Sequence, residues 1–327
     1  MKVVRVREHG GPQALLVEEE PLPQPGPGQV RVAMKAVGLN HLDVWVRRGV
    51  PGHRFPLPLI GGSDGAGVVD TGPRKGERVA LAPATSCGQC ARCEAGQDNL
   101  CRHYRIRGEG QDGTAREFLV VAEADLLTMP QGMDFVEAAA IPLAFLTAWQ
   151  MLRKSRLSAG ETVLVLGGTS GVGSAAIQIA KNLGAEVVAA AGSPERRSRC
   201  LELGADRAVD SRGDYHREVK AEVVFEHVGE ATWQRSLRAL KWGGRLVTCG
   251  ATTGPRAEVD LRVLFFKQLE LIGSTMGTRE DLQAMWGEVQ AGRLKPVVGQ
   301  VYGFEDIARA HADLEGGRVM GKAVLRL

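Results

Sequence analysis

Residues Val163–Ser174 read VLVLGGTSGVGS, an apolar run followed by a glycine-rich turn and the start of an amphipathic segment. This order predicts a buried strand, a tight turn and a helix. Glycine suits the turn because the backbone must bend sharply and approach a phosphate without a Cβ in the way, and the following helix N-terminus offers free N–H groups. The residues expected to contact a dinucleotide here are Gly168, Thr169, Ser170, Gly171, Val172 and Gly173, with Ser170 in the place of the middle glycine of the usual GxGxxG pattern.

Continuous apolar runs separated by amphipathic segments extend from about residue 125 to residue 276. Such runs are typical of strands buried on both faces, because parallel sheets carry helices on each side. The pattern predicts an α/β fold with a doubly wound (Rossmann) sheet of six parallel strands. A structural glycine turn in another α/β protein is the alternative. The candidate strands are residues 163–166, 186–190, 207–210, 223–226, 245–249 and 270–273.

The second of these strands runs into the sequence AAGSPERR, residues 190–197, with no acid at the strand end. Sheets that bind NAD usually place an Asp or Glu there against the ribose 2′-hydroxyl, and such a carboxylate would repel a 2′-phosphate. Gly192 leaves room for that phosphate, Ser193 can donate a hydrogen bond, and Arg197 can pair with it. We therefore predict NADPH rather than NADH, unless Arg196 and Arg197 are simply solvated helix residues.

Four cysteines fall within fifteen residues with the spacing C-x2-C-x2-C-x7-C. Thiolates this close on a loop can surround one tetrahedral Zn²⁺ at about 2.3 Å each, which leaves no open coordination position. We predict one structural zinc ion held by Cys87, Cys90, Cys93 and Cys101. An iron–sulfur cluster, which also uses four cysteines, and plain disulfides are the alternatives.

The bulk composition excludes several classes of protein. A length of 327 residues suffices for two domains, and 44% hydrophobic with 24% charged residues is ordinary for a globular protein. The net charge of +3, from 41 basic and 38 acidic side chains, indicates neither a nucleic acid nor a membrane as partner. The N-terminus lacks the apolar core of a signal peptide, and no apolar run is long enough to span a bilayer. Clustered cysteines fit a reducing cytoplasm.

Residue composition and hydrophobic pattern distinguish two further regions of the chain. Residues 1–124 are rich in Gly and Pro with short alternating runs, which predicts half-buried strands joined by turns. Residues 277–327 contain two helical stretches and a terminal apolar run. We expect this tail to complete the first domain, so that the nucleotide-binding domain, 125–276, is an insertion.

The four-cysteine segment, the inserted nucleotide domain and the ending GKAVL at 321–325 together resemble the medium-chain dehydrogenases and reductases, which include zinc alcohol dehydrogenases and quinone oxidoreductases. The resemblance implies a GroES-like β-rich catalytic domain carrying the zinc lobe, a Rossmann domain, and an active site in the cleft between them. It also implies a homodimer, or else a tetramer, formed through the sheet edge at Leu269–Ser274.

The zinc alcohol dehydrogenases of this family have a catalytic zinc, and three segments here depart from its ligand pattern. Asn40 stands in place of a Cys, and Ser63 and Asp64 stand in place of a His and a Glu. The segment 142–147, matching the third ligand, has no thiol, imidazole or carboxylate. Such a set suits Zn²⁺ poorly. The resemblance is closer to the quinone-oxidoreductase branch and implies hydride transfer without catalytic metal to a quinone or an α,β-unsaturated carbonyl.

Within that resemblance, Asn40 is expected to hydrogen-bond the substrate carbonyl or the nicotinamide, and Thr147 to line the site. His41 and Asp43 are candidates for a proton relay, although Asp43 could equally cap a helix. Lys322 is expected to reach a cofactor phosphate, or to be a plain strand-edge lysine. Two rival interpretations remain: an alcohol dehydrogenase whose catalytic zinc uses unusual ligands such as Asp64, and a non-enzymatic NADPH sensor.

Overall fold

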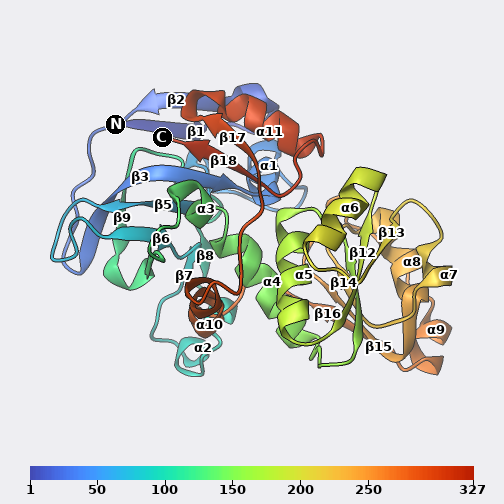
Figure 1. Cartoon of the computed structure of the whole chain (residues 1–327). Helices are drawn as coiled ribbons and strands as arrows, with labels where there is room; N and C mark the ends of the chain where they lie inside the picture. The colour runs from blue at the N-terminus through green and yellow to red at the C-terminus, as the bar shows by residue number, and fades with distance from the viewer. The chain divides into compact units, whose positions relative to one another are not determined.

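A computed structural model describes residues 1–327 as two compact units (Figure 1). Unit 1 comprises Met1–Ala144 and Thr278–Leu327, and unit 2 comprises Phe145–Gly277. The expected boundary after residue 124 therefore lies inside unit 1. Residues 125–144 belong there because β10 (Leu126–Thr128) pairs with β6 (Arg78–Leu81) and because α3 (Phe135–Ala139) packs on β3 (Gln29–Leu39) and β5 (Asp64–Val69), strands of the unit 1 sheet.

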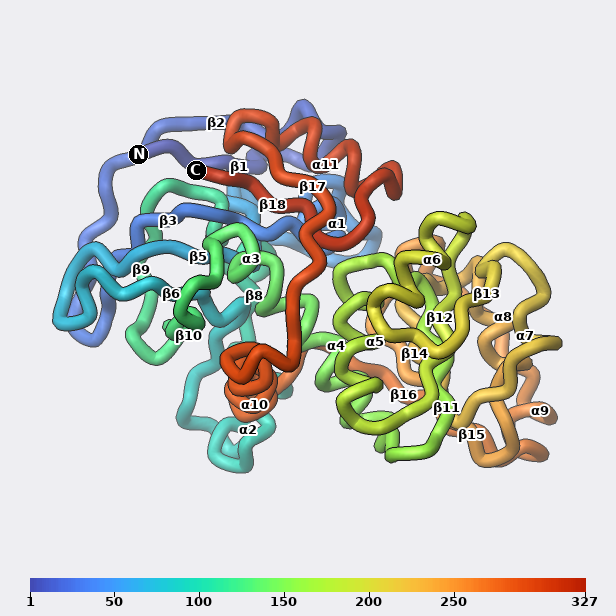
Figure 2. Tube along the Cα trace, in the orientation of Figure 1, coloured from blue at the N-terminus to red at the C-terminus, as the bar shows by residue number.

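Unit 1 is built around β3 (Gln29–Leu39), an eleven-residue strand whose even-numbered side chains are buried. Its main sheet has the order β10-β6-β5-β3-β18-β17, and β9 also pairs with β3. The other strands of this sheet are β5 (Asp64–Val69), β6 (Arg78–Leu81), β9 (Phe118–Ala122), β10 (Leu126–Thr128), β17 (Val298–Gly303) and β18 (Lys322–Arg326). Figure 2 shows the C-terminal segment returning to lie beside the N-terminal strands. The expected completion of the first domain by the tail follows from the pairing of β18 with β3.

Smaller elements complete unit 1. A second sheet has the order β2-β1-β4, and β7 pairs with β8. These strands are β1 (Lys2–Val6), β2 (Leu15–Glu19), β4 (Leu59–Ile60), β7 (Ala84–Thr85) and β8 (Arg105–Ile106). The helices are α1 (His41–Arg48), α2 (Ala91–Glu94), α3 (Phe135–Ala139), α10 (Arg279–Gln290) and α11 (Ile307–Glu315), with 3₁₀ turns η1 (Pro12–Ala14), η2 (Asp98–Leu100), η3 (Glu123–Asp125) and η4 (Phe304–Asp306). Helix α4 (Pro142–Lys154) begins in unit 1 and continues into unit 2.

Unit 2 is a single sheet of six strands in the order β13-β12-β11-β14-β15-β16, and every neighbouring pair is parallel. This order is that of the doubly wound dinucleotide-binding fold. The prediction of six parallel strands is confirmed, at β11 (Thr162–Leu166), β12 (Glu186–Ala191), β13 (Arg207–Asp210), β14 (Ala221–Glu226), β15 (Leu240–Thr248) and β16 (Glu270–Gly273). The helices are α5 (Gly171–Asn182), α6 (Pro194–Glu202), α7 (Tyr215–Glu218), α8 (Glu230–Ala239) and α9 (Leu261–Phe266). No helix of the chain has the length and apolar character of a membrane span.

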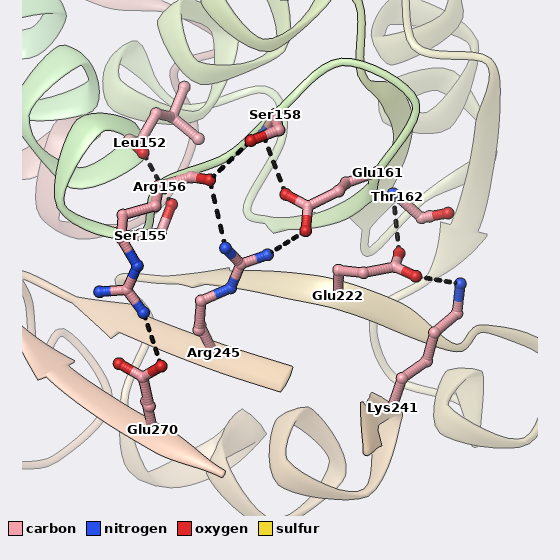
Figure 3. A network of polar contacts seen from close by, with 10 residues as sticks. All are labelled: Leu152, Ser155, Arg156, Ser158, Glu161, Thr162, Glu222, Lys241, Arg245 and Glu270. Atoms are coloured by element: carbon pink, nitrogen blue, oxygen red, sulfur yellow. Dashed lines mark hydrogen bonds and ion pairs between the residues drawn. The ribbon is translucent and has the colours of Figure 1, made fainter. Parts of the chain in front are cut away.

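An ion-pair network lies at the N-terminal ends of the unit 2 strands (Figure 3). The Arg245 guanidinium donates to the Arg156 carbonyl oxygen at 3.2 Å and pairs with Glu161, while Arg156 pairs with Glu270 at 2.5 Å. Beside it, Glu222 accepts from Lys241 at 2.6 Å and from the backbone N–H of Thr162 at 2.9 Å (Figure 3). Together the two groups of contacts join β11, β14, β15 and β16 at the end of the sheet opposite the glycine-rich turn.

Candidate functional site

The glycine-rich turn lies at the carboxyl end of β11, whose five residues are all buried. Ser170 is the N-cap of α5, and its hydroxyl accepts a hydrogen bond from the Gly173 N–H at 2.9 Å. A Cβ on Gly173 would lie 2.2 Å from the Gly167 carbonyl oxygen, so only glycine permits this close approach of helix and turn. Serine in place of the middle glycine therefore caps the helix. The remaining free N–H groups of the first turn of α5 are those that suit an anionic ligand.

Three arginines gather at the carboxyl ends of β12 and β13. Arg196 donates to the Thr169 hydroxyl at 3.1 Å, and Arg197 lies 3.6 Å from the Asp210 carboxylate. Ser193 caps α6 by accepting from the Arg196 N–H at 3.2 Å. Arg212 was not singled out from the sequence, yet a Cβ on Gly192 would lie 3.3 Å from its Nε. The signal in the sequence is its place two residues after the end of β13.

The four predicted zinc ligands come together within unit 1. Their sulfur atoms all lie within 4.8 Å of one another, and four of the pairs are separated by 3.5 to 3.9 Å. Sulfurs placed about 2.3 Å from a central Zn²⁺ in a tetrahedron are about 3.8 Å apart, so these distances fit the ion. Backbone hydrogen bonds, first from Cys87 and then from His103, lower the pKa of the Cys101 thiol, which favours the thiolate that a metal requires.

A second polar cluster lies where three strands of the unit 1 sheet meet. Asn40 directly follows β3, and Asp64 and Lys322 are the first residues of the two strands that flank it. The register places Asp64 opposite Gly38 and places Ala323, the residue after Lys322, opposite Leu39. The three side chains are buried, with 7%, 0% and 4% of their residues' surface exposed. We call Asn40, Asp64 and Lys322 the lysine cluster.

Hydrogen bonds within the lysine cluster form a closed triangle. The Lys322 ammonium donates to Asn40 Oδ1 at 2.5 Å and to Asp64 Oδ2 at 2.9 Å, and Asn40 Nδ2 donates to Asp64 Oδ2 at 2.9 Å. The other carboxylate oxygen of Asp64 accepts from the Leu143 N–H at 2.7 Å. Lys322 thus has both of its acceptors within unit 1, and its expected contact with a cofactor phosphate stays a prediction.

The remaining predicted catalytic residues divide between the units. Asp43 accepts from the backbone N–H groups of Asn40 at 2.7 Å and of Gly62 at 3.1 Å, which makes it the second half of a capping box at the start of α1. Burial raises the pKa of Asp43 to about 6. His41 is half-buried and meets Trp45 edge-on, with ring centroids 5.6 Å apart. Thr147 is buried on the part of α4 that belongs to unit 2.

The donor chemistry of the lysine cluster does not fit a divalent cation. Asn40 Oδ1 and Asp64 Oδ2 already accept from the Lys322 ammonium, and Asp64 Oδ1 accepts from the Leu143 N–H. The ammonium would also repel a second cation placed beside it. Ser63, at the position of a zinc-ligating His, is fully buried and its hydroxyl has no hydrogen-bond partner. Neither thiolate nor imidazole, the ligands that zinc prefers, belongs to the cluster.

Comparisons with known proteins agree with both units. The alcohol dehydrogenase GroES-like domain model matches residues 26–131, and the zinc-binding dehydrogenase model matches residues 171–291. A quinone oxidoreductase of Pseudomonas aeruginosa is 32% identical over 99% of this chain and 99% of its own. The chain belongs to the medium-chain dehydrogenase/reductase family. As a member of this family it is an oxidoreductase, and the predicted family and fold are confirmed.

Two solved structures of family members cover the whole chain. An NAD-dependent alcohol dehydrogenase is 45% identical with a TM-score of 0.96, covering 100% of both chains. A cobalt- and zinc-bound thermostable alcohol dehydrogenase from Pyrobaculum aerophilum is 33% identical with a TM-score of 0.91, covering 100% of this chain and 99% of its own. The matched zinc-binding family and the four-cysteine group together indicate zinc as a metal of this protein.

Proposed function

We propose that this family member is an NADPH-dependent reductase of quinones or α,β-unsaturated carbonyl compounds that holds one structural zinc ion and uses no catalytic metal. The observation that carries the proposal is the lysine cluster, in which Asn40 and Asp64, at positions of the family's catalytic zinc ligands, are the two acceptors of the Lys322 ammonium. Quinones and conjugated carbonyls suit such a site because the charge that arrives with the hydride is delocalised, so less electrophilic help is required than for a simple ketone.

The cofactor, when bound, supplies the hydride, and the chain's residues hold and orient the reactants. The turn Gly168–Gly173 and the N-terminus of α5 are suited to the pyrophosphate. Gly192, Ser193 and Arg197 are proposed to receive the 2′-phosphate, and Arg212 is added because it lies beside Gly192. A phosphate there would displace Asp210 from its 3.6 Å contact with Arg197.

Substrate orientation and proton transfer are assigned to the remaining candidates. Asn40 is proposed to hydrogen-bond the acceptor carbonyl, and Thr147 to line the site. His41 is proposed as a proton relay to solvent. Asp43 is better suited to holding the Asn40 backbone in place, because both of its oxygens already accept backbone hydrogen bonds.

Steady-state oxidation of NADPH tests the proposed function. Purified enzyme is assayed with 1,4-benzoquinone, 9,10-phenanthrenequinone and 4-phenyl-3-buten-2-one, and with ethanol and NADP⁺ in the reverse direction. We expect turnover with the first three acceptors and none with ethanol. Tight NADPH binding without any turnover would instead favour a non-enzymatic sensor.

The second candidate is a zinc-dependent alcohol dehydrogenase with unusual ligands such as Asp64, favoured by the two alcohol dehydrogenase structures that resemble this chain. Metal content separates the two candidates. One zinc per chain, retained by the four cysteines, supports the reductase. Two zinc ions per chain, with alcohol oxidation that stops when one is removed, supports the dehydrogenase.

We also propose a homodimer, with a tetramer as the alternative, formed through the β16 edge of unit 2. Apolar side chains are exposed on β16, on α9 and at the register shift of β15: Trp242 (72% exposed), Leu261 (68%), Phe265 (62%), Phe266 (64%) and Leu271 (37%). Apolar groups gathered on a free sheet edge favour pairing with a second copy. Sedimentation equilibrium of wild type and Phe266→Asp tests the proposal, since the variant should become a monomer. None of the six cysteines forms a disulfide, and we propose a reducing cytoplasm as the compartment.

A further inference from the structure

The lysine cluster leaves two N–H donors without acceptors. An ammonium group carries three donors, and Lys322 uses two of them, on Asn40 and Asp64. The Asn40 amide carries two donors and uses one, on Asp64. Every side-chain oxygen of the cluster, in contrast, already accepts at least one hydrogen bond. A buried donor without a partner is costly, above all when it is charged, so the cluster is suited to a ligand that brings an acceptor oxygen.

The charges of Asp64 and Lys322 also favour a ligand that brings an acceptor oxygen. The carboxylate of Asp64 accepts three hydrogen bonds, from Leu143, Asn40 and Lys322, and its negative charge is balanced by the ammonium. The pair is therefore close to neutral as a whole, while the unused ammonium N–H still presents a positive hydrogen. Such a group attracts an oxygen on which negative charge develops more strongly than it attracts a neutral carbonyl.

The backbone fixes this arrangement. β18 carries Lys322 and pairs with β3, which ends next to Asn40, and β3 pairs on its other side with β5, which carries Asp64. The neighbouring residues Leu39 and Ala323 are buried at 2% and 0% exposure. Donors held by three hydrogen-bonded strands need little rearrangement when charge appears, which is what electrostatic catalysis requires.

We propose that Lys322 is a catalytic residue: its ammonium group, together with the Asn40 amide, binds the acceptor's carbonyl or quinone oxygen and stabilises the negative charge that forms there during hydride transfer. This inference rests on the proposed function and assigns the electrophile that the missing metal would otherwise supply.

The electron balance of the step is simple for a conjugated ketone. The hydride, a proton with two electrons, leaves NADPH, which becomes NADP⁺, and bonds to the β-carbon of the acceptor. The C=C electron pair shifts toward the carbonyl, whose oxygen gains the charge as an enolate and is held by Lys322 and Asn40. Solvent water then delivers a proton to the α-carbon. Lys322 is unchanged at the end of the cycle.

Replacing the ammonium tests the proposal. Lys322→Met keeps the length of the side chain and removes the donors, and Lys322→Arg restores a cation. Loss of one donor to a developing oxyanion usually lowers kcat by about 10²- to 10³-fold. We expect a fall of that size for Lys322→Met with 4-phenyl-3-buten-2-one, partial recovery in Lys322→Arg, and an unchanged Kd for NADPH. Lys35→Met, an exposed lysine on β3, is the matched control and should match wild type.

A second readout separates electrostatic catalysis from a structural role. Along a series of para-substituted 4-phenyl-3-buten-2-ones, the rate of Lys322→Met should rise more steeply with electron withdrawal than that of wild type, because the substrate must then carry the charge unaided. A fall in rate with an unchanged slope, or Lys322→Met kinetics within about threefold of wild type, would overturn the inference. The expected 10²-fold fall comes from the donor estimate above.

A double variant keeps the test valid if Lys322→Met does not fold. If Lys322→Met fails to fold because Asp64 is left unpaired, Lys322→Met/Asp64→Asn removes both charges and takes its place in the same assays.

A binding measurement tests the oxygen site without catalysis. In wild type, addition of 4-nitrophenolate should shift the ¹⁵N-detected ammonium signal of Lys322, and an unmoved signal would overturn the inference. Wild type that reduces no quinone or enone yet shows this shift would defeat the proposed function and leave the oxygen-binding site standing.

Discussion

Unit 1 holds two polar clusters, and they are opposites. The four-cysteine group brings four sulfur atoms together, 3.5 to 3.9 Å apart in the contacting pairs, and none of its own side chains is a cation. The lysine cluster already contains a cation, the Lys322 ammonium, and has N–H groups without acceptors. The first is therefore suited to a metal that holds its thiolates together, whereas the second is unsuited to a metal and suited to an oxygen atom. In our proposal the two sites of this domain differ in function because Lys322 supplies at one the positive charge that zinc would supply at the other.

The largest expected effect comes from removing a ligand of the four-cysteine group. Cys101→Ser should abolish zinc binding and lower the Tm by at least about 10 °C, because binding of structural zinc contributes on the order of 10 kcal/mol to folding in small zinc domains. Metal analysis and calorimetry measure the two quantities. Cys249→Ser, a thiol outside the group, is the control and should keep one zinc per chain. A Cys101→Ser protein that retains both its zinc and its Tm would contradict the assignment.

The next largest effect is the loss of stability when the buried Lys322 ammonium loses its counter-ion. Asp64→Leu should lower the free energy of unfolding by about 3–5 kcal/mol, because it leaves the buried Lys322 ammonium without its counter-ion. Urea denaturation measures the change. Asp206→Asn breaks the half-exposed pair with Lys181 and should cost no more than about 1 kcal/mol. Equal effects of the two substitutions would mean that burial does not set the strength of the pair.

A smaller effect concerns Asp43, which adjoins the cluster through the Asn40 backbone. Burial raises its pKa from 3.8 to about 6, so the folded protein holds this proton more tightly than the unfolded chain does. Its contribution to stability is full below about pH 4 and is lost as the pH rises through about 6, by roughly 3 kcal/mol at 1.36 kcal/mol per pKa unit. Unfolding free energies of wild type and Asp43→Asn between pH 4 and pH 8 should differ in slope in this window. Parallel profiles would rule out the raised pKa.

The smallest effect concerns Arg197 and Arg212 of unit 2, which are again positive groups proposed to bind a negatively charged part of the ligand. Arg197→Ala and Arg212→Ala should each weaken NADPH binding about 10- to 100-fold, the worth of one charge-assisted hydrogen bond, and leave NADH binding unchanged. Fluorescence titration with both reduced cofactors gives the constants. Arg207→Ala, an exposed arginine on β13, serves as the control. Equal wild-type constants for NADPH and NADH would remove the proposed preference.

The sequence predicted unit 2 well because its signals are local. Runs such as residues 163–166 are apolar on both faces, and a sheet covered by helices is the arrangement that buries them. The four cysteines lie close enough in sequence that the loop alone brings them together. The start of β15 at Leu240 was missed because its register against β14 shifts between Ala221 and Val223 and because exposed Trp242 and Gly243 interrupt the apolar pattern.

The lysine cluster could not be assembled from the sequence, because its parts are far apart in the chain. Lys322 lies 282 residues from Asn40 and 258 from Asp64, and only the pairing of β18 and β5 with β3 brings them together. Without that register, Lys322 could only be assigned to a phosphate or to a strand edge. Arg212 was missed for the same reason, since its neighbour Gly192 belongs to a different strand end.

The turn before β18 limits how this protein can be altered. Gly321 has a φ of 93°, and a Cβ there would lie 2.3 Å from the Val297 carbonyl oxygen. Because side chains alternate along a strand, one residue inserted after this glycine would rotate the amine of Lys322 to the opposite side of the sheet. Deletions or insertions in this turn should thus lower both activity and stability, and loop grafts between family members will have to keep its length even where they change its composition.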